Sequence, residues 1–250
     1  MPEAPNVVFI YCDELRADAL SCYPHGSYRP HTPNLDRLAR RGIVFENTFC
    51  TSPICVASRT SMLTGTHCET HGVYANEGVW PGFDAPPELL TWPEVFSHAG
   101  CTTGSFGKHH VPNSILKWDH HDPTGGGMKI FSEHLPPDDP SIIRAAGVNG
   151  GRYPADAPYP AEQVTDRGLA WLAERDENER WLTRFSYLQP HTPVYPPAWA
   201  VAEVENDPAS AAISGEIEPP GDVSELEKRF AATMSTDELT PEQIRLTRVY

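Results

Sequence analysis

Residues 7–14 of the chain read VVFIYCDE, an apolar and aromatic run that ends in two adjacent carboxylates. Continuous apolar runs rich in β-branched residues are typical of strands buried on both faces of a sheet. We therefore expect a buried strand over 7–12, with Asp13 and Glu14 at its carboxyl end. Because unpaired charges are costly to bury, these carboxylates predict a divalent cation, and oxygen ligands suit Mg²⁺ or Ca²⁺. Alternatively, Asp13 caps the next helix and Glu14 is solvated.

Beyond this strand, helical and strand patterns alternate along the chain. Such alternation predicts an α/β fold, with a mostly parallel sheet sandwiched between helices, and we expect one catalytic domain over residues 1–250. Residues 111–160 are rich in Gly, Pro, Asp and His and predict an irregular insertion. The expected helices are 33–41, 53–64, 93–98, 161–175, 223–233 and 241–250, and the expected strands are 43–49, 101–106 and 181–188.

Ligands of such sheets bind beyond the carboxyl ends of the strands. Asp13 and Glu14 lie at one such end, Lys108, His109 and His110 at a second, and His191 at a third. The pattern therefore predicts one site built from these residues.

The composition of the chain excludes several classes of function. The net charge of −15 argues against nucleic acid, which needs basic side chains to neutralise phosphates. An anionic substrate must then be bound by a local cluster of cationic groups.

The first residues of the chain lack the basic region and the long apolar run of a signal peptide, and no stretch could cross a bilayer. We therefore expect a cytoplasmic protein with no membrane contact. The six cysteines form no CxxC pair and are expected to be reduced.

The stretch CVASRTSMLTG at residues 55–65 places a cysteine four residues before Arg59, near a predicted helix start. A thiol in that position can have a lowered pKa, so a direct cysteine hydrolase using Cys55 and His191 is one interpretation. The stretch also resembles the signature of the type I sulfatases, Cys-x-Pro-Ser-Arg followed by a helix and Leu-Thr-Gly.

Further segments resemble the same family, and they occur in the family's order. Together they extend from about residue 6 to residue 197. The matching segments are Asn6–Ile10 with Asp13 and Glu14, Thr32–Ala39 with Gly42, Phe45–Cys55, Gly107–His110 and Pro190–Pro193.

The resemblance implies an alkaline phosphatase-like fold and hydrolysis of a small sulfate ester. It implies that a formylglycine-generating enzyme converts Cys55 to formylglycine, an aldehyde that hydrates to a geminal diol. Asp13, Glu14 and residue 55 would then hold a divalent metal, usually Ca²⁺, with Mg²⁺ or Mn²⁺ as alternatives.

The resemblance also implies roles for the remaining residues of the site. Arg59 would stabilise the diol oxygen and Lys108 a sulfate oxygen. His110 would help remove the second diol proton, and His191 would protonate the leaving alkoxide. We interpret His109 as a neighbour without a role of its own.

The chain departs from the family pattern in several places. Ala57 stands where many sulfatases have Pro, and Glu14 stands where Asp is commoner. The later Ser-Asp-His-Gly-like run that completes the metal site does not occur before Tyr250, so we expect a fragment or a truncated product. Two alternatives therefore stay open: a phosphonate monoester or phosphodiester hydrolase of the same superfamily, and a truncated relative without activity.

Overall fold

The computed structural model describes residues 5–23, 30–77, 84–122, 143–145, 148–150, 153–192 and 194–206. The chain divides into two compact units. The first comprises Met1–Asp13, Asn47–Phe131 and Pro160–Leu188, and the second comprises Glu14–Glu46, Ser132–Tyr159 and Gln189–Tyr250. The expected helices 223–233 and 241–250 lie outside the described residues.

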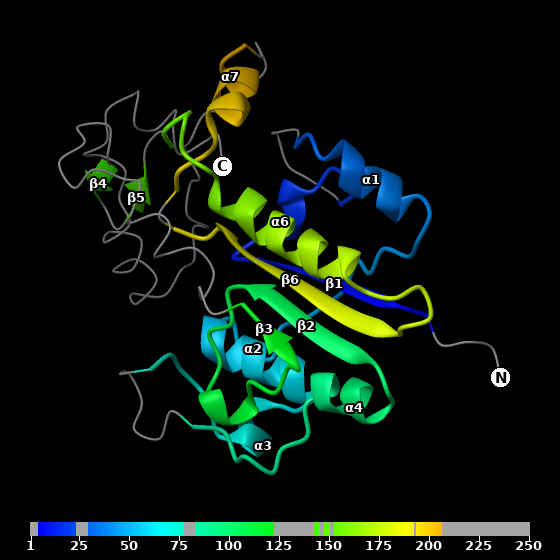
Figure 1. Ribbon diagram of the computed structural model, residues 1–250. Helices are drawn as coiled ribbons and strands as arrows, with labels where there is room; N and C mark the ends of the chain where they lie inside the picture. The colour runs from blue at the N-terminus through cyan, green and yellow to red at the C-terminus, as the bar shows by residue number, and fades with distance from the viewer. Residues whose placement is uncertain are drawn as a thin grey trace, which may run out of the picture. The chain divides into compact units, whose positions relative to one another are not determined.

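The centre of the first unit is a four-stranded sheet with the order β1-β6-β2-β3 (Figure 1). Strand β2 (Thr102–Gly107) runs parallel both to β6 (Trp181–Pro190) and to the short β3 (His120–His121). The register of β2 and β6 runs from Thr102 opposite Trp181 to Gly107 opposite Ser186. The prediction of a mostly parallel α/β sheet is confirmed.

Helices cover both faces of this sheet. Helices α2 (Cys55–Thr64) and α4 (Trp92–His98) lie on one side, and α6 (Pro160–Ala173) lies on the other (Figure 1). The core on the α2 side includes Val56, Leu63, Trp118 and Leu182, whereas the core on the α6 side contains Phe106, Val164 and Trp171. Burial of these apolar side chains is the main force that holds the helices against the sheet.

Local sequence explains where α2 begins and ends. Its N-cap, Ile54, is extended, so Cys55 is the first helical residue. Gly65 ends the helix in the left-handed conformation, which glycine adopts without steric cost, and its N–H bonds to the carbonyl of Ser61. The predicted helix over this stretch is confirmed. It carries Cys55 and Arg59 on adjacent turns.

Two local expectations are wrong. Strand β1 (Val7–Asp13) exists, but it is not buried on both faces: the alternate residues Val8 and Ile10, which share one face, are 49% and 54% exposed. Residues 43–49 form no strand, and Phe49 is 89% exposed. Helix α1 (Pro33–Ala39) forms as predicted, and none of its residues is buried.

The other described elements are short. In the first unit they are η2 (Asn113–Ile115) and α3 (Cys68–His71), a helix that the sequence patterns did not indicate. The described part of the second unit also contains η1 (Ala17–Ala19), α7 (Ala198–Asn206) and an antiparallel pair, β4 (Ile143–Ala145) with β5 (Val148–Gly150). Within the described residues, no helix has the length and apolar character needed to cross a membrane.

Gly107 joins β2 to the turn that carries Lys108, and the position tolerates only glycine. Its φ is +92°, and a Cβ there would lie 2.1 Å from the carbonyl oxygen of Ser186. We expect Gly107→Ala to lower the free energy of unfolding by roughly 2–4 kcal/mol, because the backbone must shift as well as adopt a strained φ. Urea denaturation of the purified protein measures this change.

The matched control is Gly65→Ala. Gly65 also has a positive φ, +65°, but no atom lies within 4 Å of its added Cβ. That variant should lose only about 1 kcal/mol, the cost of the left-handed conformation. Equal losses in the two variants would show that contact with Ser186 does not matter.

Candidate active site

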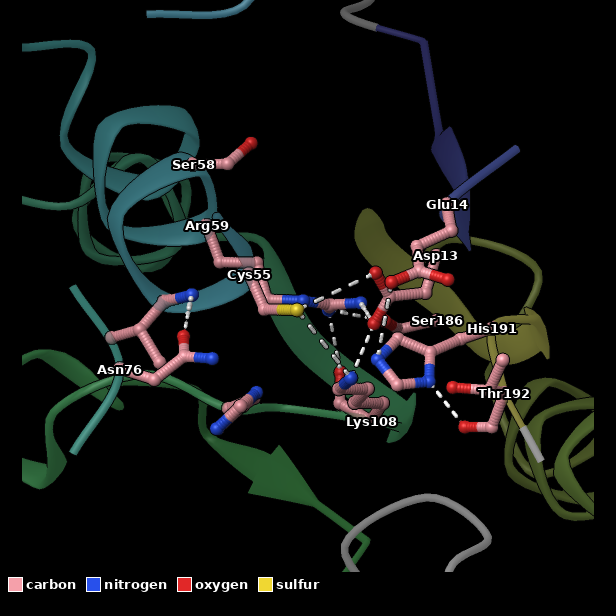
Figure 2. Close-up of polar contacts among 12 residues, drawn as sticks. Asp13, Glu14, Cys55, Ser58, Arg59, Asn76, Lys108, Ser186, His191 and Thr192 are labelled. Atoms are coloured by element: carbon pink, nitrogen blue, oxygen red, sulfur yellow. Dashed lines mark hydrogen bonds and ion pairs between the residues drawn. The ribbon is translucent and has the colours of Figure 1, made fainter. Parts of the chain in front are cut away.

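Asp13 ends β1 and lies at the centre of a charged cluster in the first unit (Figure 2). Its side chain is buried and forms ion pairs with two cationic side chains. Its Oδ2 lies 3.2 Å from Arg59 Nη2 and also contacts Lys108 Nζ. A buried carboxylate is stable only with such partners.

Cys55 faces this cluster from the first turn of α2 (Figure 2). Its Sγ lies 3.9 Å from Asp13 Oδ1 and 3.9 Å from Lys108 Nζ. The next residue, Val56, donates its backbone N–H to Asn76 Oδ1 at 3.1 Å, which satisfies one of the free N–H groups at the start of the helix. The helix start and Lys108 thus hold Cys55 beside the carboxylate.

Arg59 lies one helical turn after Cys55 and is fully buried. Its Nη1 donates to the carbonyl oxygen of Lys108 at 2.9 Å and to Ser186 Oγ at 2.8 Å. Its guanidinium also stacks over the ring of Tyr11, 4.6 Å from the centroid. Arg59 therefore connects α2 to three strands of the sheet, because its partners lie on β1, on β6 and directly after β2.

The immediate surroundings of Cys55 carry more positive than negative charge. Arg59 and Lys108 are cationic, and the carboxylate to which both are paired is that of Asp13. A buried cluster of this kind attracts an anion even though the whole chain carries a net charge of −15. Arg59 and Lys108 are thus the kind of local cationic group that an anionic substrate would need.

His109 has a structural role that the sequence analysis did not assign. Its ring is buried, with Nδ1 2.9 Å from Arg184 Nη2 and Nε2 3.1 Å from the carbonyl oxygen of Asp122. Burial, and then the charge of Arg184, lower the pKa of His109 to about 4, so the ring is neutral at pH 7. In this neutral tautomer Nδ1 accepts from Arg184 and Nε2–H donates to Asp122.

Arg184, which holds His109, was missed by the sequence analysis, although the sequence contains a signal for it. It lies inside the apolar strand β6 and is fully buried, where it donates to Ser105 Oγ at 2.9 Å as well as to His109. A charged residue in the middle of a buried strand requires polar partners. Its partners, however, come from β2 and from the turn after it, and no local pattern identifies them.

The remaining predicted site residues fall in two places. His110, in the first unit, contacts Glu77, which the sequence analysis also missed. Glu14 and His191 belong to the second unit, where His191 Nε2 lies 3.4 Å from Glu14 Oε1 and His191 Nδ1 contacts the carbonyl oxygen of Thr192. The predicted residues thus form a cluster of Asp13, Cys55, Arg59 and Lys108, a His110–Glu77 pair and a Glu14–His191 pair.

The cluster in the first unit is suited to part of a metal site. Asp13 Oδ1 faces the side chain of Cys55, so an oxygen carried by residue 55 and Asp13 Oδ1 could share one cation. The carboxylate is a hard oxygen ligand of the kind that Ca²⁺ and Mg²⁺ prefer. These two donors are a minority of the six to eight oxygens that Ca²⁺ usually takes.

Comparison with known proteins places this chain in a family. The model for the family described as Sulfatase matches residues 5–244. The chain is 28% identical over 187 residues to an N-acetylglucosamine-6-O-sulfatase of Bacteroides thetaiotaomicron, covering 75% of this chain and 31% of that protein. It is also 28% identical over 221 residues to an arylsulfatase of Clostridium perfringens, covering 77% of this chain and 44% of that protein.

Solved structures share the fold. A phosphonate monoester hydrolase of Agrobacterium radiobacter aligns with a TM-score of 0.60 and 21% identity, over 79% of this chain and 43% of that chain. A protein solved in complex with its substrate D-glucosamine-2-N,6-O-disulfate aligns with a TM-score of 0.59 and 22% identity, over 82% of this chain and 38% of that chain. The chain spans less than half the length of each of these relatives.

The parallel sheet between helices, with charged residues at the ends of its strands, defines an alkaline phosphatase-like α/β fold. The chain belongs to the sulfatase family, as the match over residues 5–244 shows.

Proposed function

We propose that the protein hydrolyses small sulfate esters through a formylglycine made from Cys55, with a divalent metal ion bound beside it. The contact of Cys55 with both Asp13 and Lys108, at 3.9 Å each, is the observation that carries this proposal. It puts the side chain that would attack sulfur between a hard metal ligand and a cation able to hold a sulfate oxygen. Members of the sulfatase family generally depend on a metal ion.

Within the first unit, each candidate residue has a distinct task in this mechanism. Asp13 would hold the metal ion, and Arg59 balances the charge of Asp13 and holds the backbone of Lys108. Lys108 holds a sulfate oxygen and offsets the negative charge that grows in the transition state. His110 takes a proton from the hydrated aldehyde.

For two residues of the second unit, the proposed roles rest on the resemblance of the sequence to the sulfatases. Glu14 follows Asp13 directly in the chain and is proposed as the next metal ligand. His191 follows the end of β6 and is proposed to protonate the leaving alkoxide. Bound metal would lower the pKa of the hydroxyl that attacks sulfur.

The geminal diol explains why the family modifies a cysteine. After one hydroxyl has attacked sulfur, the adduct still carries the second hydroxyl. Removal of that proton converts the adduct back to the aldehyde and breaks the C–O bond to sulfate. Sulfate therefore leaves without a second attack by water on sulfur.

A phosphonate monoester or phosphodiester hydrolase is the second candidate. This candidate is supported by the alignment with the phosphonate monoester hydrolase of Agrobacterium radiobacter, at a TM-score of 0.60. That likeness is one of fold. Sulfate monoesters and phosphonate monoesters each carry one negative charge, so the cationic cluster at Lys108 and Arg59 suits both. Relative turnover of an aryl sulfate and an aryl phosphonate ester separates the two candidates.

The chemical state of residue 55 is the direct test. We expect the full-length protein, produced together with a formylglycine-generating enzyme, to yield a peptide whose mass corresponds to the aldehyde at residue 55. Removal of the metal with a chelator should then abolish turnover, and Ca²⁺ should restore it. An intact Cys55 under these conditions would exclude the diol mechanism and favour the alternative that the protein is a truncated relative without activity. Turnover that is blocked by alkylation of the thiol would instead indicate a cysteine hydrolase.

A further inference from the structure

His110 occupies a constrained position at the end of the turn that carries Lys108. Its backbone φ is +46°, in the left-handed region that residues with a Cβ rarely adopt. Its Nε2 lies 3.0 Å and 3.3 Å from the two carboxylate oxygens of Glu77. Its Nδ1 is buried and, within the part of the chain that the structure describes, has no hydrogen-bond partner. The two nitrogens of this ring therefore have different surroundings.

Glu77 is the neighbour of Asn76, which bonds to the first turn of α2. Asn76 Oδ1 accepts from Val56 N–H, one residue after Cys55, while Glu77 binds the ring of His110. This pair of consecutive residues thus contacts both the helix that carries the nucleophile and the histidine proposed as its base. The contacts fix His110 relative to the start of α2 within the first unit.

Glu77 is well suited to accept a hydrogen bond. A hydrogen bond from its own backbone N–H, and then its contact with His110 and the nearby charge of Lys108, hold the pKa of its carboxyl below the usual value. An ionised carboxylate only accepts hydrogen bonds, so the Nε2 that it contacts must carry the proton. A neutral imidazole with Nε2–H has its lone pair on Nδ1.

We propose that Glu77 is a positioning residue: it accepts a hydrogen bond from His110 Nε2–H and thereby makes the buried Nδ1 the nitrogen that takes the proton at residue 55. The inference rests on the proposed function, because it specifies how His110 acts there. In that step the O–H bond of the second hydroxyl breaks and its proton moves to Nδ1. Its electron pair forms the C=O bond while the C–O bond to sulfate breaks, and Nε2–H stays bonded to Glu77.

Two residues of nearly the same volume as Glu, introduced at position 77, separate the effect of the hydrogen-bond acceptor from the effect of side-chain volume. Glu77→Gln keeps an oxygen that can accept from Nε2–H, whereas Glu77→Met has no such oxygen. In the full-length protein with aldehyde at residue 55, we expect Glu77→Met to lower kcat for an aryl sulfate by about 10–100-fold with little change in KM. Glu77→Gln should keep most of the kcat of the wild-type protein.

The control is Glu88→Met, which removes another exposed carboxylate of the first unit. It should leave kcat unchanged. If Glu77→Met also leaves kcat unchanged, or if Glu77→Gln is as slow as Glu77→Met, the positioning role is excluded. A rise in KM without a fall in kcat would likewise contradict it, because it would make Glu77 a substrate-binding residue.

A second readout does not depend on activity. In protein labelled with ¹⁵N-histidine, the His110 signal, identified by its loss in His110→Asn, should show the Nε2–H tautomer in the wild type and a mixture in Glu77→Met. A wild-type Nδ1–H tautomer would overturn the inference. If residue 55 proves to be unmodified cysteine while the tautomer is as expected, the proposed function fails and the Glu77–His110 pairing stands.

Discussion

Cys55→Ala is expected to abolish turnover of sulfate esters by the full-length protein. The substitution removes the side chain that the proposed mechanism converts to the attacking group. Loss of a covalent nucleophile typically costs about four to six orders of magnitude in kcat. The expected effect on stability is small, because the contacts of Sγ with Asp13 Oδ1 and Lys108 Nζ are long, at 3.9 Å each. Steady-state kinetics with an aryl sulfate measures the first effect, and urea denaturation the second.

The matched variant is Cys55→Ser, which keeps one hydroxyl but cannot become a geminal diol. It should accept the sulfuryl group once and then stop, since no second hydroxyl is available to expel sulfate. Mass spectrometry of the intact protein should therefore show a stoichiometric adduct at residue 55. Full multiple-turnover activity in either variant would be incompatible with a nucleophile at this position.

Arg59→Met is expected to be the most destabilising substitution in the site. It removes a guanidinium that is fully buried and paired with Asp13 Oδ2, Ser186 Oγ and the carbonyl oxygen of Lys108. Removal of one partner of a buried ion pair costs about 3–5 kcal/mol, because the remaining charge stays buried. The free energy of unfolding should fall by about this amount in a urea titration. Activity should also fall, because the backbone of Lys108 loses a partner.

Two variants test this interpretation of Arg59. Arg59→Lys keeps the positive charge, but an ammonium group cannot present the planar fork of donors, so most of the stability should still be lost. Arg41→Met removes an exposed arginine and should change the free energy of unfolding by less than about 0.5 kcal/mol. If Arg59→Met were no worse than Arg41→Met, the network around Asp13 would not stabilise the fold.

Much of the local structure could be predicted because its causes lie within a few residues. The helix over Cys55–Thr64 has its stop signal, Gly65, directly after it, and the strand over Val7–Asp13 is an apolar run. Lys108 directly follows β2, at the carboxyl end of that strand, which explains why Lys108 could be associated with Asp13 from sequence alone. The order of the family's motifs supported the same grouping.

The wrong predictions concern burial, which is not a local property. Val8 and Ile10 lie on one face of β1, and an apolar run does not say whether distant segments of the chain will cover that face. The same reason applies to residues 43–49, whose apolar pattern is that of a strand although no strand forms there. Periodicity predicts which side chains can be buried, and tertiary contacts decide which of them are.

The sequence by itself determined most of the helices and strands around the site, their α/β order, and the candidate residues Asp13, Cys55, Arg59 and Lys108. Only the tertiary structure decided how the histidines are held: His109 by Arg184, 75 residues away, and His110 by Glu77, 33 residues away. The physical reason is that helix caps and apolar periodicity depend on neighbours in the chain. A hydrogen bond to a buried ring instead depends on which distant strand or turn the packing of the core brings beside it.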